Sequence, residues 1–350
     1  MKNIKKDLMF YHIKTKSFTL IELLVVIVII GILAGVITLS VSSNISKAQD
    51  LKISSTILSV SKTLKSDSYD SFPIETVACN LKNSCTTLKA RIDLPNITED
   101  IYYKTSSSGK FFVIYANKPS NTSLGYEITS IDEKVKEVPS FDNLVAYYPL
   151  ATGTANGTAI SDMSPNSNNG TNYGASSATG VDGNIGTVMS FDGVDDYVEV
   201  ADSSSISPTD QISVSAWVKF NVVGENIGIV WKNNYNYLLY CEVSGVNFLI
   251  YDTLGKSSIA SVTYGLISPG EWYHIVGTFG SDHKARIYLN NVLYSTGSEI
   301  TNIRDREGSL IFGARGDSAG ERYLNGSIDD VRIYNRVLSQ SEVTLLYNNK

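Results

Sequence analysis

Near its N-terminus the chain reads Lys16-Ser17-Phe18-Thr19-Leu20-Ile21-Glu22-Leu23-Leu24-Val25-Val26, and this string begins an apolar run that ends at Val41. The run contains a single charge, Glu22. At ~1.5 Å per residue a helix over residues 18–41 covers ~36 Å, which is enough to cross a bilayer. Residues 1–17 carry lysines and one aspartate, so we expect one membrane span with its N-terminus in the cytoplasm.

Glu22 separates this run from simpler membrane signals. An ordinary secretory signal peptide has a shorter apolar core of about 7–15 residues. A plain anchor explains the span and the lysines but not a carboxylate inside hydrocarbon, which is costly without a partner. Cleavage before Phe18 would create an α-ammonium four residues from Glu22. In a helical bundle, Glu22 of one subunit could then pair with the Phe18 ammonium of its neighbour.

Together these residues resemble the signal of type IV prepilins and type II secretion pseudopilins, although that pattern has glycine where this chain has Ser17. The resemblance implies that prepilin peptidase cuts between Ser17 and Phe18 and that the new N-terminus is methylated. It also implies assembly with other pilin or pseudopilin subunits through Glu22. The expected route is a single-pass precursor in the bacterial cytoplasmic membrane, then the cell surface, a pilus or a pseudopilus. On this reading residues 1–17 are a leader, 18–41 a transmembrane and polymerisation helix, and 42–140 a pilin-like remainder.

Composition agrees with an extracellular protein of two or three domains. The length of 350 residues suggests two or three domains, and the 21 tyrosines are typical of β-rich extracellular proteins. The net charge of −6 shows no basic footprint for nucleic acid. Cys79 and Cys85 lie in a polar loop, and an oxidising compartment favours a disulfide between them over two free thiols. Cys241 alternates within a strand-like run and is expected in a core.

The region after the apolar run has an α+β pattern. Helical spacing of apolar residues continues to about Leu64, as the positions Ile53, Ile57 and Val60 show. Two hairpin-like segments within 101–137 then predict a small sheet, which ends near Pro139-Ser140.

From about residue 141 the pattern is all-β. Strand-like runs alternate with turns rich in Gly, Asn, Asp and Ser, which predicts one large antiparallel sandwich over 143–350. Residues 339–347 read as a short helix that begins with a capping box. The runs lie at 187–191, 196–200, 212–220, 236–243, 246–251, 272–279, 285–289, 309–313 and 328–334.

Several strings in this region resemble the laminin-G-like, concanavalin A-type jelly roll, in the order of that family. The resemblance implies the fold, but lectins, adhesion modules and enzymes share it, so function must be argued from the site. The strings are Leu144–Leu150, Asp162–Thr171, Phe191–Val198, Ser215–Lys219, Glu271–Val276 and Gly326–Arg336.

One structural calcium ion is the expected cofactor. Asp162 and Asn169 lie in an oxygen-rich loop, and Asp329 opens the last strand, which would pair with the first. A hard cation takes six to eight oxygen ligands of this kind, and the resemblance implies calcium in many members. The alternative is that these side chains form turns and bind backbone amides.

Trp217, Tyr235 and Tyr237 are the candidate ligand-binding residues. Trp217 leaves its strand on the face opposite Val214 and Val218, where a flat ring could hold a sugar; packing against another segment is the alternative. We expect no catalytic site, because the closely spaced acids Glu-x-Asp-x-x-Glu of glucanases with this fold are missing from the sequence.

The sequence therefore predicts a minor type IV pilin-like subunit that displays a lectin-like domain for adhesion to a glycan or a surface. Two alternatives stay open. The protein could be a type II secretion pseudopilin, or a membrane-anchored binding protein or glycan hydrolase that never polymerises.

Overall fold

A computed structural model describes residues 44–66, 73, 75, 77–91, 97–106, 112–129, 134–150, 159–179, 187–223, 226–316 and 322–349. The chain divides into two compact units, residues 1–49 and 50–350. The expected leader, membrane span, cleavage site at Ser17 and Phe18, and assembly residue Glu22 lie outside the described residues. Among the helices that are described, none is long and apolar enough to cross a membrane.

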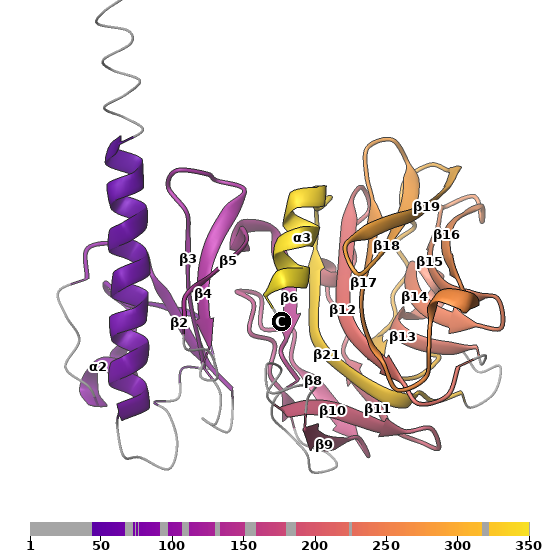
Figure 1. Cartoon of the computed structure of the whole chain (residues 1–350), viewed down its shortest axis with the longest axis horizontal. Helices are drawn as coiled ribbons and strands as arrows, with labels where there is room; N and C mark the ends of the chain where they lie inside the picture. The colour runs from indigo at the N-terminus through magenta and orange to yellow at the C-terminus, as the bar shows by residue number, and fades with distance from the viewer. Residues whose placement is uncertain are drawn as a thin grey trace, which may run out of the picture. The chain divides into compact units, whose positions relative to one another are not determined.

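A helix over residues 44–66 precedes a small antiparallel sheet (Figure 1). The helical face anticipated from the sequence is buried, because Ile53, Ile57, Val60 and Leu64 belong to one core with apolar side chains of the sheet. The strands follow chain order and are β1 (Cys79–Asn80), β2 (Tyr102–Thr105), β3 (Phe112–Asn117), β4 (Leu124–Thr129) and β5 (Lys136–Pro139).

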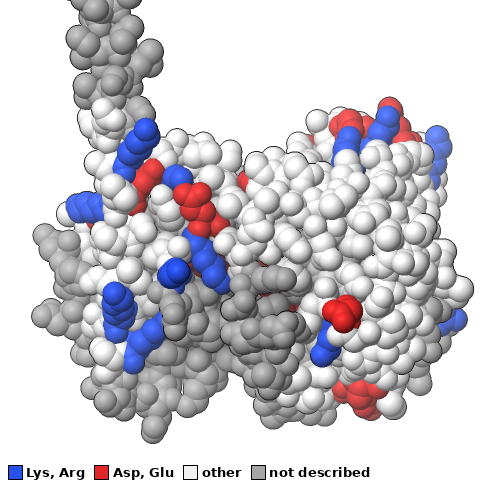
Figure 2. Space-filling view, viewed as in Figure 1, with Lys and Arg blue, Asp and Glu red and all other residues white. Residues whose placement is uncertain are grey.

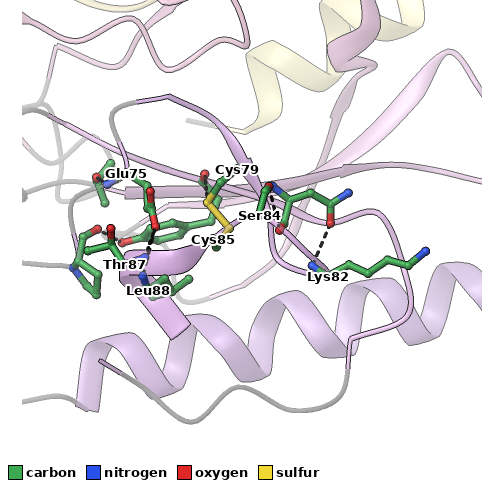
Figure 3. Close-up of a disulfide and its surroundings, with 11 residues drawn as sticks. Glu75, Cys79, Lys82, Ser84, Cys85, Thr87 and Leu88 are labelled. Carbon is green, nitrogen blue, oxygen red and sulfur yellow. Dashed lines mark hydrogen bonds between the residues drawn. A yellow bond between two sulfur atoms is a disulfide. The ribbon is translucent and has the colours of Figure 1, made fainter. Parts of the chain in front are cut away.

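A disulfide joins Cys79 to Cys85, the pair named from the sequence, at the edge of this sheet (Figure 3). The bridged loop leads directly into the short helix α2 (Thr86–Arg91). Glu75 supplies the start of α2 with an acceptor, since its Oε1 receives hydrogen bonds from Thr87 N at 2.8 Å and Leu88 N at 3.2 Å. The loop, the helix start and the sheet edge are thus tied together locally.

The described residues from 144 onward form a sandwich of two eight-stranded antiparallel sheets. We name them after a central strand of each. The β12 sheet has the order β19-β18-β17-β12-β21-β10-β9, with β6 also paired to β21. Its strands are β6 (Leu144–Tyr148), β9 (Ser176–Thr179), β10 (Thr187–Asp192), β12 (Ile212–Phe220), β17 (Trp272–Phe279), β18 (Lys284–Leu289), β19 (Val292–Glu299) and β21 (Asn325–Tyr334).

The β13 sheet has the order β16-β15-β14-β13-β20-β11-β8-β7. Four single 3-10 turns accompany the strands: η1 (Phe141–Asn143), η2 (Ser204–Ile206), η3 (Asn233–Tyr235) and η4 (Tyr264–Leu266). The strands of this sheet are β7 (Ala159–Ile160), β8 (Gly170–Tyr173), β11 (Tyr197–Val200), β13 (Ile227–Lys232), β14 (Tyr237–Glu242), β15 (Gly245–Tyr251), β16 (Ser257–Thr263) and β20 (Leu310–Phe312).

The main core lies between the two sheets and confirms the antiparallel sandwich expected from the sequence. Alternate residues of β12, such as Ile212, Val214 and Val218, belong to it, as do Phe248 and Phe279. Every strand-like run that was read from the sequence of this region corresponds to a strand. Period-two apolar patterning therefore decides which face of each strand is buried.

The C-terminal helix α3 (Gln340–Asn348) covers part of the outer face of the β12 sheet. It begins with the expected capping box, in which Ser339 N donates to Glu342 Oε2 at 2.8 Å and Glu342 N donates back to Ser339 Oγ. The Tyr347 ring on α3 stacks on Trp217 of β12, with centroids 5.7 Å apart and planes 16° from parallel.

The small sheet is joined to the sandwich by a buried ion pair. Arg332 of β21 donates from Nη2 and Nη1 to the two oxygens of Glu127 on β4, at 3.0 and 3.2 Å. Both side chains are nearly inaccessible, at 5% and 2% exposed, and the guanidinium lies 4.1 Å from the Tyr147 ring centroid. Lys104 of β2 also donates to the Ser164 carbonyl at 2.6 Å. Within residues 50–350 the sheet and the sandwich therefore pack as one compact unit.

Candidate functional site

The structure places two of the three proposed ligand-binding residues away from solvent. Trp217 is 2% exposed and lies between His274 and Tyr347, while Tyr237 is inside the main core and donates its hydroxyl to the Ile206 carbonyl. Neither ring offers a face to a ligand here, because α3 covers the first and the β12 sheet covers the second. Tyr235 belongs to η3, and its side chain lies outside the described part.

Two of the proposed metal ligands lie together in one loop. Asn169 Oδ1 accepts from Asp162 N at 3.0 Å. Asp162 is fully buried, and its carboxylate already accepts four hydrogen bonds. A cation would have to displace these donors, so Asp162 behaves as the organiser of the loop. The donors are Tyr147 N, Ser164 N, Ser164 Oγ and Asn168 N.

Asp329 is on β21, and no hydrogen bond in the described structure links it to Asp162 or Asn169. Burial, followed by the neighbouring charge of Asp330, raises the pKa of Asp329 well above its usual range. A carboxyl that stays protonated is a poor ligand for a hard cation, although a bound ion would lower its pKa. A structural calcium ion remains a prediction.

A different acidic group comes together in the β10–β11 turn. Carboxylate oxygens of Asp192, Asp195 and Asp196 lie within 4.8 Å of one another, the distance that a shared cation requires. Asp192 Oδ1 accepts from Val194 N at 2.7 Å, however, and Asp196 Oδ2 accepts from Asp192 N at 2.8 Å. These bonds explain the cluster as turn formation, and we assign no site to it.

The outer surface of the β13 sheet carries the strongest candidate for a ligand surface, a cluster separate from the main core. Strand alternation creates it, because in β14 Tyr237 and Leu239 point into the core while Leu238 and Tyr240 point outward. We call its rings the aromatic face. They are Tyr173, Tyr197, Trp231, Tyr240, Tyr251 and Tyr323.

The aromatic face runs across neighbouring strands. Tyr173 and Tyr197 are cross-strand partners whose rings stack at 4.6 Å with planes 12° from parallel. Tyr323 lies 6.4 Å from Tyr197, and further along the sheet Trp231 meets Tyr240 edge-on at 6.2 Å. Tyr173 is 37% exposed, so this end of the row is open to solvent.

Two arginines lie over the row. The Arg315 guanidinium is 5.4 Å from the Trp231 ring centroid, and that of Arg304 is 4.7 Å from Tyr251. Burial, and then the charge of Glu242, raises the pKa of Tyr240 to about 12, so its hydroxyl keeps its proton at neutral pH.

Stacked rings beside hydrogen-bond donors can hold flat, hydroxylated rings. The sequence reasoning missed this surface because it did not read residues 227–232 as a strand, and hence did not place Trp231. The available signal was the alternation of β14, where Tyr240 follows two residues after Leu238 on the outward side.

Two segments of this chain match the models of known protein families. Residues 14–38 match the model of the prokaryotic N-terminal methylation motif. Residues 192–344 match that of the concanavalin A-like lectin/glucanases superfamily. The chain therefore carries a methylation motif near its N-terminus and a lectin-like segment in the sandwich. The motif indicates a type IV pilin-like or pseudopilin subunit that is made as a membrane-anchored precursor. No curated protein matches the chain.

Among solved structures, the sandwich is similar to receptor- and sugar-binding modules at low identity. The binding domain of Paraclostridial Mosquitocidal Protein 1 is 22% identical, with a TM-score of 0.48, over 59% of this chain and 52% of that one. Domain 4 of the arabinanase AbnA from Geobacillus stearothermophilus, solved with arabinotriose, is 20% identical, with a TM-score of 0.47, over 59% and 98%. The receptor-binding domain of a botulinum neurotoxin C/D mosaic is 14% identical, with a TM-score of 0.47, over 60% and 52%. The chain spans about half the length of the first and third of these structures.

Proposed function

We propose that this protein is a minor type IV pilin-like subunit whose sandwich binds a glycan or a surface outside the cell. The observation that carries the proposal is the fusion of a methylation motif to a sandwich whose aromatic face ends in the exposed ring of Tyr173, stacked on Tyr197. The sandwich is larger than the small sheet, so crowding would disfavour it in every subunit of a filament. Finding the protein as the bulk subunit of long filaments would contradict the minor role.

Assembly would proceed through the N-terminal helix. Prepilin peptidase would cut between Ser17 and Phe18, and Glu22 would pair with the Phe18 ammonium of a neighbouring subunit, because each charge is costly alone in hydrocarbon. Mass spectrometry of protein made with a prepilin peptidase tests this. A mature, N-methylated chain beginning at Phe18 is expected. A chain that retains Ser17 would favour a membrane-tethered protein that does not polymerise.

Binding would use the aromatic face. Only 18% of the residues are charged, and in the view of Figure 2 the surface over the sandwich is largely uncharged, which favours a neutral ligand over a polyion. A glycan array probed with the mature, detergent-solubilised protein should give hits that Tyr197→Ala weakens. The matched control is Tyr294→Ala, because Tyr294 is exposed on β19 of the other sheet. Equal binding by both variants would remove the aromatic face from the proposal.

We also propose a binding role without catalysis. The support is the placement of the acidic side chains beside the rings. Glu199 on β11 and Glu242 on β14 belong to strands separated by β20 and β13, which puts them ~14 Å apart across the sheet, farther than the paired carboxyl groups of glycosidases. Incubation with the polysaccharides that score on the array, followed by a reducing-end assay, tests it. Release of new reducing ends would return the glycan hydrolase to consideration.

A further inference from the structure

A cavity of about 330 Å³ lies at the junction between the small sheet and the sandwich, away from the aromatic face. Its volume is at the lower end of the range typical of small-molecule sites, ~300–1,000 Å³. Strands β2 and β3, the turn η1 and the loop that carries Pro165 enclose it. The lining residues are Ala78, Tyr102, Tyr115, Asn117, Phe141, Asp142 and Pro165.

One wall is a ladder of three stacked rings. Tyr102 and Tyr115 are cross-strand partners with centroids 5.4 Å apart, and Phe141 stacks on Tyr115 at 4.3 Å. Tyr115 and Phe141 are almost fully buried, whereas Tyr102 is half-buried. The inner two rings therefore hold Tyr102 in place at the wall of the cavity, where it stays partly exposed.

The polar edge of the cavity is also fixed in place. Asn117 Nδ2 donates to Asp142 Oδ1 at 2.6 Å, and Asn117 Oδ1 accepts from Phe141 N at 3.3 Å and Ser140 Oγ at 3.2 Å. Asp142 is exposed, and no lysine or arginine of the described residues forms an ion pair with it. Its carboxylate is thus held beside the ring ladder with capacity to accept further hydrogen bonds.

We propose that this cavity is a binding site for a single saccharide ring. The apolar face of a pyranose would stack on Tyr102, and its hydroxyls would donate to Asp142 and exchange hydrogen bonds with Asn117. Pro165 and Ala78 supply apolar contact at the side. The site is independent of the aromatic face and does not rest on the proposed binding function of that face.

The test is saturation-transfer difference NMR on the mature, detergent-solubilised full chain. The probes are the methyl pyranosides of glucose, galactose and N-acetylglucosamine, each at millimolar concentration. At least one should receive saturation at its ring protons. Ala78→Leu, which fills the cavity without removing a hydrogen bond, should abolish the signal. Tyr102→Ala should weaken binding by about tenfold, as expected for loss of a stacked ring.

Two further variants separate this site from the alternatives. Asp142→Asn keeps the shape and the Asn117 contact but should weaken binding, because a neutral amide is a weaker acceptor than a carboxylate. Tyr294→Ala is the neutral control, because Tyr294 is exposed on β19 and belongs to neither proposed surface, so the signal should be unchanged. Tyr173→Ala reports on the aromatic face. Binding lost in Tyr173→Ala but kept in Ala78→Leu would overturn the cavity and support the aromatic face. Arginine and choline, measured in the same way, are the cationic control probes. Absence of any saccharide signal, or saturation transfer to these cations alone, would also overturn the proposal.

Discussion

The two outer faces of the sandwich both carry aromatic side chains but differ in what packs over them. Helix α3 covers part of the β12 sheet, whereas on the β13 sheet neighbouring side chains bury Trp231 and Tyr240 and leave Tyr173 37% exposed. On the β12 sheet, one apolar cluster combines residues from the sandwich, such as Val276 and Tyr334, with Val113 of the small sheet and Val343 of α3. On the β13 sheet, the corresponding cluster consists of side chains from the sheet and from Ala314 and Tyr323 in the segment that follows β20.

This difference shows why a tryptophan on a lectin-like strand does not mark a ligand site by itself. Trp217 leaves its strand outward, as its alternation predicts, yet Tyr347 and His274 cover it. On the β13 sheet Trp231 and Tyr240 are buried as well, and among the described rings of that face Tyr173 is the most exposed. The end of the face at Tyr173 is therefore the part available to a ligand. The predictions below compare the covered face with the aromatic face.

The largest effect on stability is expected for the buried ion pair between Arg332 and Glu127, which joins the small sheet to the β12 sheet. Arg332→Met removes the guanidinium that donates to Glu127 and Asp330. Removal of one partner from a buried pair costs ~3–5 kcal/mol of unfolding free energy. Denaturant unfolding followed by fluorescence measures it. Arg286→Met is the matched control, because its pair with Asp282 is partly exposed and should contribute less than ~1 kcal/mol. Similar losses in both variants would mean that the Arg332 pair does not hold the small sheet to the sandwich.

Trp217→Ala should cost ~3 kcal/mol of stability and leave glycan binding by the folded protein unchanged. The reason is that the indole packs under α3 and takes no part in the aromatic face. Unfolding curves and the glycan array, run on the same preparations, give both numbers. A variant that keeps its stability but loses glycan binding would return Trp217 to the ligand site.

The sandwich, the C-terminal helix and the buried face of the helix over residues 44–66 could be predicted from the sequence, because each follows from a local pattern. Alternation located β12, and the Ser339–Glu342 spacing located α3. Several strands of the sandwich were not among the predicted runs, and three of them illustrate the physical reasons. β13 is apolar without alternation, β16 is built mainly from small polar residues, and β19 is an exposed edge strand with little to bury.

The candidate site was less accessible from sequence, because it depends on which face becomes covered. Nothing local to Trp217 shows that a helix more than a hundred residues later will stack on it. The same holds for the cavity beside Tyr102, which requires Phe141 and Pro165 to meet the small sheet. Long-range packing decides these features, and local patterns do not encode it directly.

The covered face should also make stability depend on pH through His274. Its buried ring contacts Trp217 and Tyr347, and its Nε2 lies 2.9 Å from Ser215 Oγ. Burial, then the charge of Arg332, lowers the pKa of His274 to about 3. The unfolded chain takes up this proton near pH 6.5, so stability is full above that pH and falls as pH drops towards 3, by at most ~1.4 kcal/mol per unit. His274→Gln should flatten the profile between pH 6.5 and 4.5. If stability changes with pH in the same way in the variant and the unchanged protein, His274 does not contribute to the pH dependence.

The smallest stability effect is expected on the aromatic face itself. Tyr173→Ala removes one ring of an open stacked pair and should change the unfolding free energy by less than ~1 kcal/mol, because a partly exposed ring buries little area. Its effect on glycan binding should be larger than its effect on folding, the reverse of the result for Trp217→Ala. Thermal unfolding and the array give the two quantities together. If Tyr173→Ala destabilises the fold by several kcal/mol instead, the open rings serve the fold, and the two faces of the sandwich do not differ in role.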